Sequence, residues 1–249
     1  MFTWEGYFAK SLGGQAINVF HCSGEERMKF QSIFDVIGPN MIGPSSSHTA
    51  GAALIGLLAR KLFNEKIVRA DFMLYESFAR TGKGHGTDRA LLGGVMGFAT
   101  DDLRIRDAYA YARQQNLVYT FTFDTSAKMP HPNTVDILLA GSGSNRMTVR
   151  GESLGGGKIM ITRIDGIDVE FTGEFSTLIV KHMDIPGVVA HITRILAERR
   201  VNLAFMRLFR EKRGENACTI VESDEKIPTE AVEEIKKNPA IHKTILIEI

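Results

Sequence analysis

Residues 174–249 restrict the fold of this chain more than any other stretch, because strand-like and helix-like segments alternate there in one order. The strand-like segments are short and β-rich, and the helical ones place their apolar residues on one face. In chain order they are a strand at 176–181, a helix at 188–196, strands at 201–210 and 217–222, a helix at 228–235 and a strand at 243–249. The order β-α-β-β-α-β predicts a ferredoxin-like α+β domain.

Residues 28–173 form the other predicted domain, in which helical and strand-like segments also mix. Helices are expected after residue 51, at 89–98 and at 107–115, and strands at 67–76, 117–123, 135–139, 146–150, 158–164 and 168–171. We therefore predict an α+β domain with a mixed sheet. Its polar motifs all lie on the turns, where functional groups are commonly mounted.

The charge and cysteine counts exclude several classes of protein. Lys and Arg number 30 against 29 Asp and Glu, so the chain lacks the positive surplus that nucleic-acid binding requires. Its apolar runs are too short to span a bilayer. Two cysteines, Cys22 and Cys218, supply neither a disulfide framework nor the ligands of an iron–sulfur cluster. We expect a cytoplasmic protein that binds neither nucleic acid nor membrane and holds no metal itself.

Residues 1–27 differ from the rest of the chain. Their aromatic residues are scattered, and they lack the basic start and long apolar middle of a signal peptide. Residues 24–27 back-translate to a purine-rich run of the kind that positions a bacterial ribosome before Met28. We expect residues 1–27 to be a non-native or disordered extension.

A cluster of hydroxyls marks the first functional turn, Gly43-Pro44-Ser45-Ser46-Ser47-His48-Thr49-Ala50-Gly51. Side-chain and backbone donors at a helix start can converge on one anion, so this turn predicts a carboxylate or phosphate site. The alternative is that one serine caps the helix while the others face solvent.

Two further turns carry imidazoles. Lys83-Gly84-His85-Gly86-Thr87-Asp88 sets His85 between glycines, and an imidazole that titrates near neutrality suits proton transfer. We expect Thr87 to cap the helix that follows. In the proline-rich turn at 129–134, His131 and Asn133 are held at fixed spacing. Each turn alone is a weak indicator of function.

Other active-site patterns fail on spacing. The run 155–158 looks like a phosphate loop, but Glu152 stands where the first glycine belongs and Ile159 replaces the Ser or Thr. The dinucleotide fingerprint, the zinc motifs and the nucleophile elbow are absent from the sequence. The chain thus has polar turns without a complete catalytic constellation of a known type.

The first strand-to-helix turn of the C-terminal domain, Asp184-Ile185-Pro186-Gly187, together with the strand order, resembles that of ACT domains. Such domains bind small effectors, often amino acids. The resemblance implies effector-binding roles for Asp184, Pro186 and Gly187. Asp184 would receive an ammonium group, and Gly187 would let a ligand approach backbone N–H groups. The alternative is that Asp184 caps the helix.

The motifs taken together, in this order and ahead of an ACT-like domain, resemble the β subunit of iron–sulfur-dependent L-serine dehydratase. The resemblance covers residues 28–249 and rests on GPSSSHTAG at 43–51, KGHGTD at 83–88, His131–Asn133 and the glycine-rich run 151–158. It implies that residues 28–173 form a domain of the allosteric-substrate-binding type, also found in some 3-phosphoglycerate dehydrogenases. It also implies the two-chain form of the enzyme.

That family deaminates L-serine to pyruvate and ammonia, with a 4Fe–4S cluster held by cysteines of an α subunit. The resemblance implies that an α subunit is required as partner and that His85 is the catalytic acid or base. His131 and Asn133 would contact substrate. The remaining residues implied in substrate binding are Ser45, Ser46, Ser47, His48 and Thr49. L-serine or another amino acid is the expected effector, and self-association through the ACT domain is a further expectation.

Two rival interpretations remain open at this point. A non-catalytic subunit that senses an amino acid would also carry an ACT domain and would lack a self-contained active site. A substrate-binding fragment of a serine-biosynthetic dehydrogenase is disfavoured by the missing dinucleotide motif. The sequence leaves serine and threonine equally acceptable as substrates.

Overall fold

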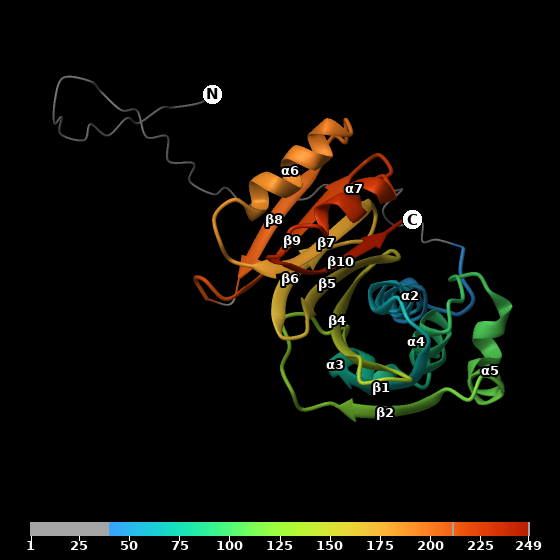
Figure 1. The fold of residues 1–249 in the computed structure, drawn as a ribbon. Helices are drawn as coiled ribbons and strands as arrows, with labels where there is room; N and C mark the ends of the chain where they lie inside the picture. The colour runs from blue at the N-terminus through green and yellow to red at the C-terminus, as the bar shows by residue number, and fades with distance from the viewer. Residues whose placement is uncertain (1–39, 211, 249) are drawn as a thin grey trace, which may run out of the picture.

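The computed structural model describes residues 40–210 and 212–248, which fold into two domains, each built on one β-sheet (Figure 1). The predictions about residues 1–27, Cys22 and a start at Met28 lie outside the described residues. The predicted α+β class, with a mixed sheet followed by a ferredoxin-like domain, is confirmed.

The first domain contains a six-stranded sheet in the order β2-β1-β3-β4-β5-β6. β1 and β2 run parallel, and every other neighbouring pair is antiparallel. The strands are β1 (Ile67–Tyr75), β2 (Val118–Asp124), β3 (Thr134–Gly141), β4 (Arg146–Gly155), β5 (Lys158–Ile164) and β6 (Ile167–Phe171).

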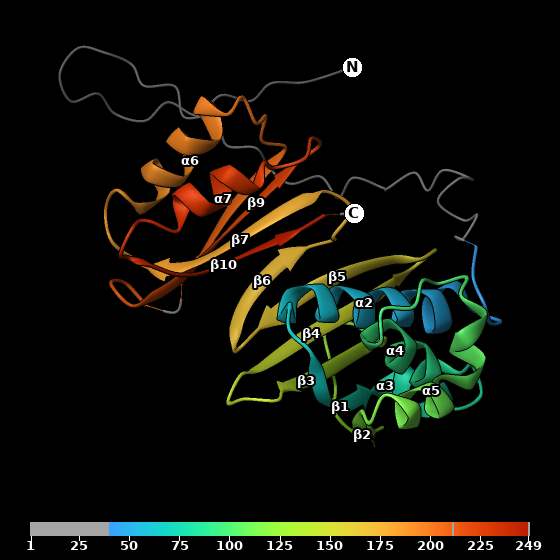
Figure 2. The ribbon, with the colours of Figure 1, turned by 45° about the vertical axis from the view of Figure 1, so that its right-hand side comes forward.

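Helices cover one face of this sheet, with α2 and α4 lying directly on it (Figure 2). The helical segments are a π-helical turn η1 (Ser46–Ala50), α2 (Gly51–Phe63), α3 (Glu76–Thr81), α4 (Thr87–Val95), a 3-10 turn η2 (Leu103–Asp107) and α5 (Ala108–Gln114). Because β1 and β3 are antiparallel, the segment that follows β1 and the segment that precedes β3 meet at one end of the sheet. This end lies beside the start of α2.

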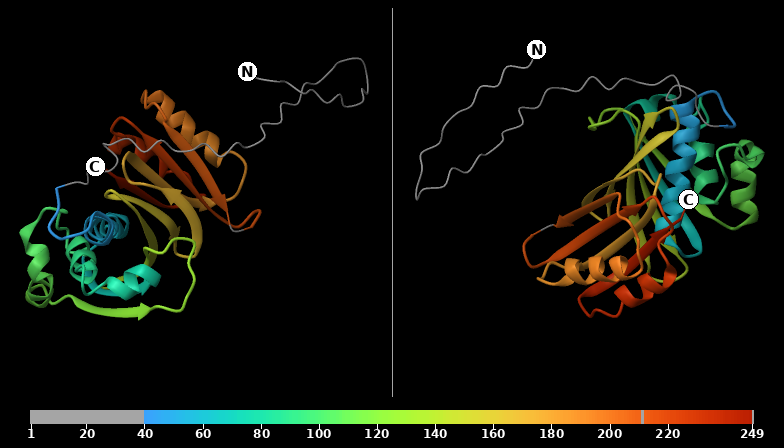
Figure 3. Two further views of the ribbon diagram at one scale, coloured as in Figure 1. Left: turned by 180° about the vertical axis from the view of Figure 1, so that it is seen from behind. Right: turned by 90° about the horizontal axis from the view of Figure 1, so that it is seen from above.

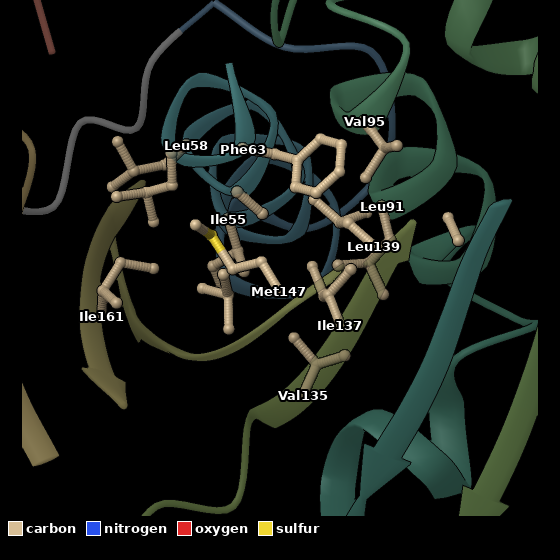
Figure 4. Close-up of a cluster of buried hydrophobic side chains, with 14 of the residues drawn as sticks. Ile55, Leu58, Phe63, Leu91, Val95, Val135, Ile137, Leu139, Met147 and Ile161 are labelled. Carbon is tan, nitrogen blue, oxygen red and sulfur yellow. The ribbon is translucent and has the colours of Figure 1, made fainter. Parts of the chain in front are cut away.

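Alternate residues of the strands form the floor of the core (Figure 4). Val135, Ile137 and Leu139 of β3 share one face of their strand and are fully buried. Ile55 of α2 and Leu91 of α4 pack in the same cluster and are also fully buried. Burying one such side chain contributes about 1.5–3 kcal/mol, so the helices are fixed firmly on the sheet.

Two glycines let α2 and α4 approach each other closely. A Cβ atom on Gly94 would lie 2.7 Å from the backbone nitrogen of Leu57 and closer still to the carbonyl oxygen of Ala53. A Cβ atom on Gly56 would lie 3.1 Å from the nitrogen of Val95. The distance between α2 and α4 thus depends on having glycine at these two positions. The distance between the loops that precede the two helices depends on it as well.

The second domain contains a four-stranded antiparallel sheet in the order β10-β7-β9-β8. Its elements are β7 (Ser176–Met183), α6 (Val188–Glu198), β8 (Phe205–Arg210), β9 (Asn216–Ser223), α7 (Thr229–Ile235) and β10 (Ile241–Ile247). The predicted order β-α-β-β-α-β is confirmed. Both helices lie on the face of the sheet that is turned away from the first domain (Figure 3).

The other face of this sheet packs against the first domain. Ile179, Cys218 and Ile220 belong to the same buried cluster as the core under α2, whereas Leu178 and Val180 pack under α6 and α7. β7 and β9 are therefore buried on both faces, and Cys218 is a core residue, as predicted. The element break falls between Phe171 and Ser176. The domain boundary at 173/174 itself stays a prediction.

Three local predictions were wrong. The glycine-rich run at 151–157 was expected to connect two strands, but β4 continues to Gly155. This strand position requires a glycine, because a Cβ on Gly151 would collide with Ile55 of α2. The strand expected from 201 begins only at Phe205. The strand expected to reach Glu76 ends one residue earlier, and the short helix α3 follows it.

Candidate functional site

The three loops that the sequence marked meet at the end of the first sheet where β1 ends and β3 begins. Hydrogen bonds join them directly. Thr49 Oγ1 donates to the carbonyl oxygen of His85 at 3.0 Å. Ser153 Oγ of β4 donates to the carbonyl oxygen of Ser47 at 2.8 Å, and Ser153 N donates to the Asn133 carbonyl at 3.0 Å. Segments far apart in the sequence thus form one site.

His48 lies at the centre of this site. Its Nδ1 is 2.9 Å from Ser47 Oγ, and its Nε2 is 2.9 Å from Ser77 Oγ. The His48 ring lies 5.0 Å from the ring of His85 and 5.4 Å, edge on, from that of Phe78. Burial lowers the pKa of His48 below its usual value, and the charge of His85 lowers it further. Both effects disfavour the protonated form of the His48 imidazole.

The three serines have different partners. Ser45 is the N-cap of the helical turn, and its Oγ accepts from His48 N at 3.1 Å. Ser47 Oγ contacts His48 Nδ1, as described above. Within the described part of the chain, the Ser46 hydroxyl has no hydrogen-bond partner. The capping interpretation is thus confirmed for Ser45.

His85 sits on the glycine-flanked loop that leads into α4. Its backbone N–H donates to the Thr81 carbonyl, and its side chain is half-buried. Its Nδ1 atom is buried without a partner among the described residues. Gly86, at φ 67°, is the N-cap of α4, so the prediction that Thr87 caps this helix was wrong. Thr87 Oγ1 is instead a second buried atom without a partner in the described residues.

His131 and Asn133 turn toward β4. His131 Nδ1 accepts from Asn133 N at 3.2 Å, so the proton of the neutral ring is on Nε2. Asn133 Nδ2 donates to the Ser153 carbonyl at 3.3 Å, which fixes the orientation of the amide. Asn133 Oδ1 is then the third buried atom at this site with no partner in the described residues. It can only accept a hydrogen bond, so it suits a ligand N–H.

Three residues of the site were not predicted from the sequence: Ser77, Ser153 and Thr87. Ser77 belongs to a helix that was not predicted, and Ser153 lies in a strand that was taken for a loop. Thr87 and Ser153 both stood in motifs, where Thr87 had a different predicted role and Ser153 had none. The signal that was available for Ser77 is the polar pair Glu76-Ser77 directly after a strand pattern.

The turn at 184–187 has a defined structure of its own. Gly187 is the N-cap of α6 at φ 92°, in the region that favours glycine, and α6 has no side-chain cap. The alternative that Asp184 caps this helix was therefore wrong. The Asp184 carboxylate accepts from Gly214 N at 3.1 Å and Arg210 Nη1 at 3.2 Å. The Gly214 amide and the Arg210 guanidinium hold the pKa of Asp184 below its usual range.

The glycine run at 155–157 is the turn of the β4–β5 hairpin, with positive φ at all three residues. It precedes a strand and not a helix, so the rejection of a phosphate loop is confirmed. The described residues also contain no group of three His, Cys, Asp or Glu side chains that could hold a metal ion. Within 40–210 and 212–248, none of the helices combines the length and the apolar character of a membrane span.

Fold and site together define a two-domain protein with a C-terminal ACT domain, since the ACT family matches residues 176–240. The family described as serine dehydratase beta chain matches residues 32–163. The chain belongs to the serine dehydratase beta chain family.

Curated relatives agree with this assignment. The probable L-serine dehydratase, beta chain, of Bacillus subtilis is 40% identical over 86% of this chain and 96% of its own length. The L-serine dehydratase, beta chain, of Peptoniphilus asaccharolyticus is 39% identical over 78% of this chain and 87% of its own. A D-3-phosphoglycerate dehydrogenase of Methanocaldococcus jannaschii is 23% identical over 80% of this chain and 37% of its own length.

Proposed function

We propose that this chain is the β subunit of a two-chain iron–sulfur L-serine dehydratase, which converts L-serine to pyruvate and ammonia together with an α subunit. The observation that carries the proposal is the convergence of His48, His85 and Asn133 from three loops at one end of the sheet. The beta-chain relatives, similar over most of their length, support it.

The described residues of this chain do not fit an iron–sulfur cluster. Cys218 is the one described cysteine, it is buried, and burial raises the pKa of its thiol to about 11. No described group of His, Cys, Asp or Glu side chains forms a ligand set. We therefore place the 4Fe–4S cluster of the proposed enzyme in the α subunit.

The reaction requires loss of the Cα proton and of the Cβ hydroxyl from serine. The removed proton and the departing hydroxide together make one water, and aminoacrylate remains. Aminoacrylate tautomerises to the imine, which water hydrolyses to pyruvate and ammonium. The base that removes the Cα proton contributes roughly 10²–10⁴-fold to the rate of such a step.

We assign that base to His85. Its loop is flanked by glycines, its ring is partly exposed, and its Nδ1 has no partner within the described residues. The ring of His48 lies 5.0 Å from that of His85, and burial disfavours the protonated form of His48. His85 is thus the imidazole that is free to exchange a proton with substrate.

The neighbouring polar groups suit the two ends of a zwitterion. The Ser46 hydroxyl, unpartnered in the described chain, donates to the carboxylate, together with the Nε2–H of His131. Asn133 Oδ1 accepts from the ammonium group. Thr49 is buried and bonded to the His85 carbonyl, so its contribution is to hold the His85 loop.

The test is co-expression with the α chain of the same operon or host, anaerobic purification and assay of L-serine-dependent pyruvate formation. We expect His85→Ala to reduce kcat by at least 100-fold, because general base catalysis is lost. His242→Gln is the matched control, since His242 is exposed on β10 in the second domain. A His85→Ala enzyme within a few-fold of wild type would contradict the assignment.

A second candidate function is a non-catalytic amino-acid sensor, which the ACT domain favours. In both candidates we propose that L-serine or another amino acid binds at Asp184, Pro186 and Gly187, where Pro186 and Gly187 are exposed. Calorimetric titration of the full chain with amino acids tests this site, and Gly187→Ala should weaken the binding. A sensor would retain its function in the His85→Ala variant, whereas a dehydratase subunit would not.

We further propose that the chain acts in the cytoplasm and self-associates through the second domain. β8 is the edge strand of that sheet, and its Phe205 and Leu208 side chains are 46% and 47% exposed. Unpaired backbone groups beside apolar side chains on an edge favour pairing with another chain. Light scattering of wild type and Leu208→Glu tests this, since the variant should shift the mass toward the monomer.

A further inference from the structure

The chain turns sharply from β1 into α3, and the turn is strained. Glu76 follows the last residue of β1 and has φ 38°, a conformation that costs a non-glycine residue of order 1 kcal/mol or more. Two contacts from the loop before β3 hold it there. Met129 N donates to Glu76 Oε1 at 2.6 Å, and Ser77 N donates to the Pro132 carbonyl at 3.0 Å.

The strained turn places one side chain at the site. Ser77 Oγ lies 2.9 Å from His48 Nε2, although the two residues are 29 positions apart. The same residue is bonded through its backbone to the loop that carries His131 and Asn133. Ser77 therefore connects the first and third functional loops, and strain of this kind persists where the surrounding structure over-determines it.

The hydroxyls around His48 favour one position for its ring proton. The backbone N–H of His48 can only donate, so Ser45 Oγ accepts from it and directs its own hydrogen elsewhere. Ser47 Oγ, at 3.3 Å, is an acceptor for that hydrogen. Ser47 then donates to His48 Nδ1 at 2.9 Å. In this arrangement every hydrogen has an acceptor when Nδ1 is unprotonated, which places the ring proton on Nε2, facing Ser77. Ser45 Oγ, 3.4 Å from Nδ1, is a second hydroxyl close enough to donate to that nitrogen.

We propose that Ser77 is a positioning residue of this site: its hydroxyl accepts the Nε2–H of His48 and thereby fixes the tautomer and orientation of the imidazole beside His85. The hydrogen bonds from Ser45 to Ser47, from Ser47 to His48 and from His48 to Ser77 are then all donated in the same direction. It leaves the Ser77 hydroxyl hydrogen directed away from the ring. The role in turnover rests on the proposed function, whereas the tautomer of His48 does not.

The first arm of the test is long-range ¹H–¹⁵N NMR of imidazole resonances in the full-length chain, with His48 assigned through His48→Gln. Wild type should show the Nε2–H tautomer at pH 8 with a slowly exchanging Nε2 proton. Ser77→Ala should give a mixture of tautomers and fast exchange, and Ser77→Thr should restore the wild-type pattern. Ser144→Ala, on the exposed β3–β4 turn, is the control and should change nothing.

The second arm measures kcat and KM of each variant in the assembled enzyme. Ser77→Ala should lower kcat by up to about 100-fold, as a mispositioned catalytic group does, with KM changed far less, and Ser77→Thr should recover most of it. An Nδ1–H tautomer in wild type, or a tautomer unaffected by Ser77→Ala, overturns the proposal. A changed tautomer with unchanged kcat overturns the positioning role. If the wild-type pair has no turnover, the proposed function fails and the spectra alone decide on Ser77.

Discussion

Replacing Gly94 by alanine tests the idea that the contact between α2 and α4 sets the geometry of the site. The added Cβ would lie 2.7 Å from Leu57 N and closer to the Ala53 carbonyl. Both neighbours are backbone atoms of a helix, so no side-chain rotation relieves the collision. The two helices must move apart.

The loss of stability can be worked out from how far the distance between the added Cβ and the atoms of α2 falls short of a normal contact. Optimal contact between non-bonded heavy atoms begins at about 3.5 Å, so α2 and α4 must separate by roughly 1 Å. A gap of this size forfeits a quarter to a half of the dispersion energy along the contact. Overpacking of cores typically costs about 1–3 kcal/mol, and we expect the upper end because the backbone cannot yield.

Thermal and urea unfolding of the full chain measure this loss. For a chain of this length, about 3 kcal/mol corresponds to a fall in Tm of roughly 6–12 °C. The matched control is Gly143→Ala, because a Cβ on Gly143 meets no atom within 4 Å and its φ lies outside the left-handed region. That variant should be neutral or more stable by up to about 1 kcal/mol, since the unfolded chain loses freedom.

The Gly94→Ala substitution should also lower the activity of the enzyme. α2 follows directly from the turn carrying His48, and α4 follows the loop carrying His85, so separating the helices also separates the two rings. Activity of the assembled enzyme should therefore fall at temperatures where the variant is still folded. A Gly94→Ala chain as stable as Gly143→Ala would refute the reasoning, because the close approach of the helices would then carry no constraint.

Three further outcomes are expected. The pKa of His48 is lowered in the folded chain, so below about pH 6.5 the unfolded chain binds more protons than the folded chain. The free energy of unfolding therefore decreases as the pH falls through this range, and His48→Gln should flatten that part of the pH–stability curve. Thr87→Val removes an unpartnered buried hydroxyl and should raise the free energy of unfolding by about 1 kcal/mol in urea titrations. Cys218 should resist iodoacetamide at pH 8 in the native chain and react in urea, as peptide mapping would show.

The order of elements in the second domain was predictable because each element is specified by its own residues. Val188, Ile192 and Ile195 share a helix face whatever the rest of the chain does, and all three are buried. β4 was not predictable in the same way. Gly151 is a residue typical of loops, yet it lies in β4. A glycine is needed there because Ile55, almost a hundred positions away, occupies the space of a side chain.

The site shows the same limit. Its motifs were visible in the sequence because serines, glycines and histidines cluster within a few positions. The roles of Ser77 and Ser153 were not visible, because they arise from contacts with residues 29 and 106 positions away, respectively. The hydrogen-bond partners of the three serines in the first turn were not predictable either, because they depend on which serine faces the His48 ring.

Buried polar atoms without a partner in the described chain gather at this one end of the first sheet. His85 Nδ1, Thr87 Oγ1 and Asn133 Oδ1 are three of the five buried side-chain atoms without a partner in the described chain, and the strained Glu76 lies beside them. Each such group costs stability, so their clustering indicates that they are retained for a ligand or a second chain. A molecule that satisfies these atoms regains that lost free energy on binding. The correct substrate or partner should therefore raise the Tm of this chain, and Thr87→Val should diminish that rise while raising the Tm of the free chain.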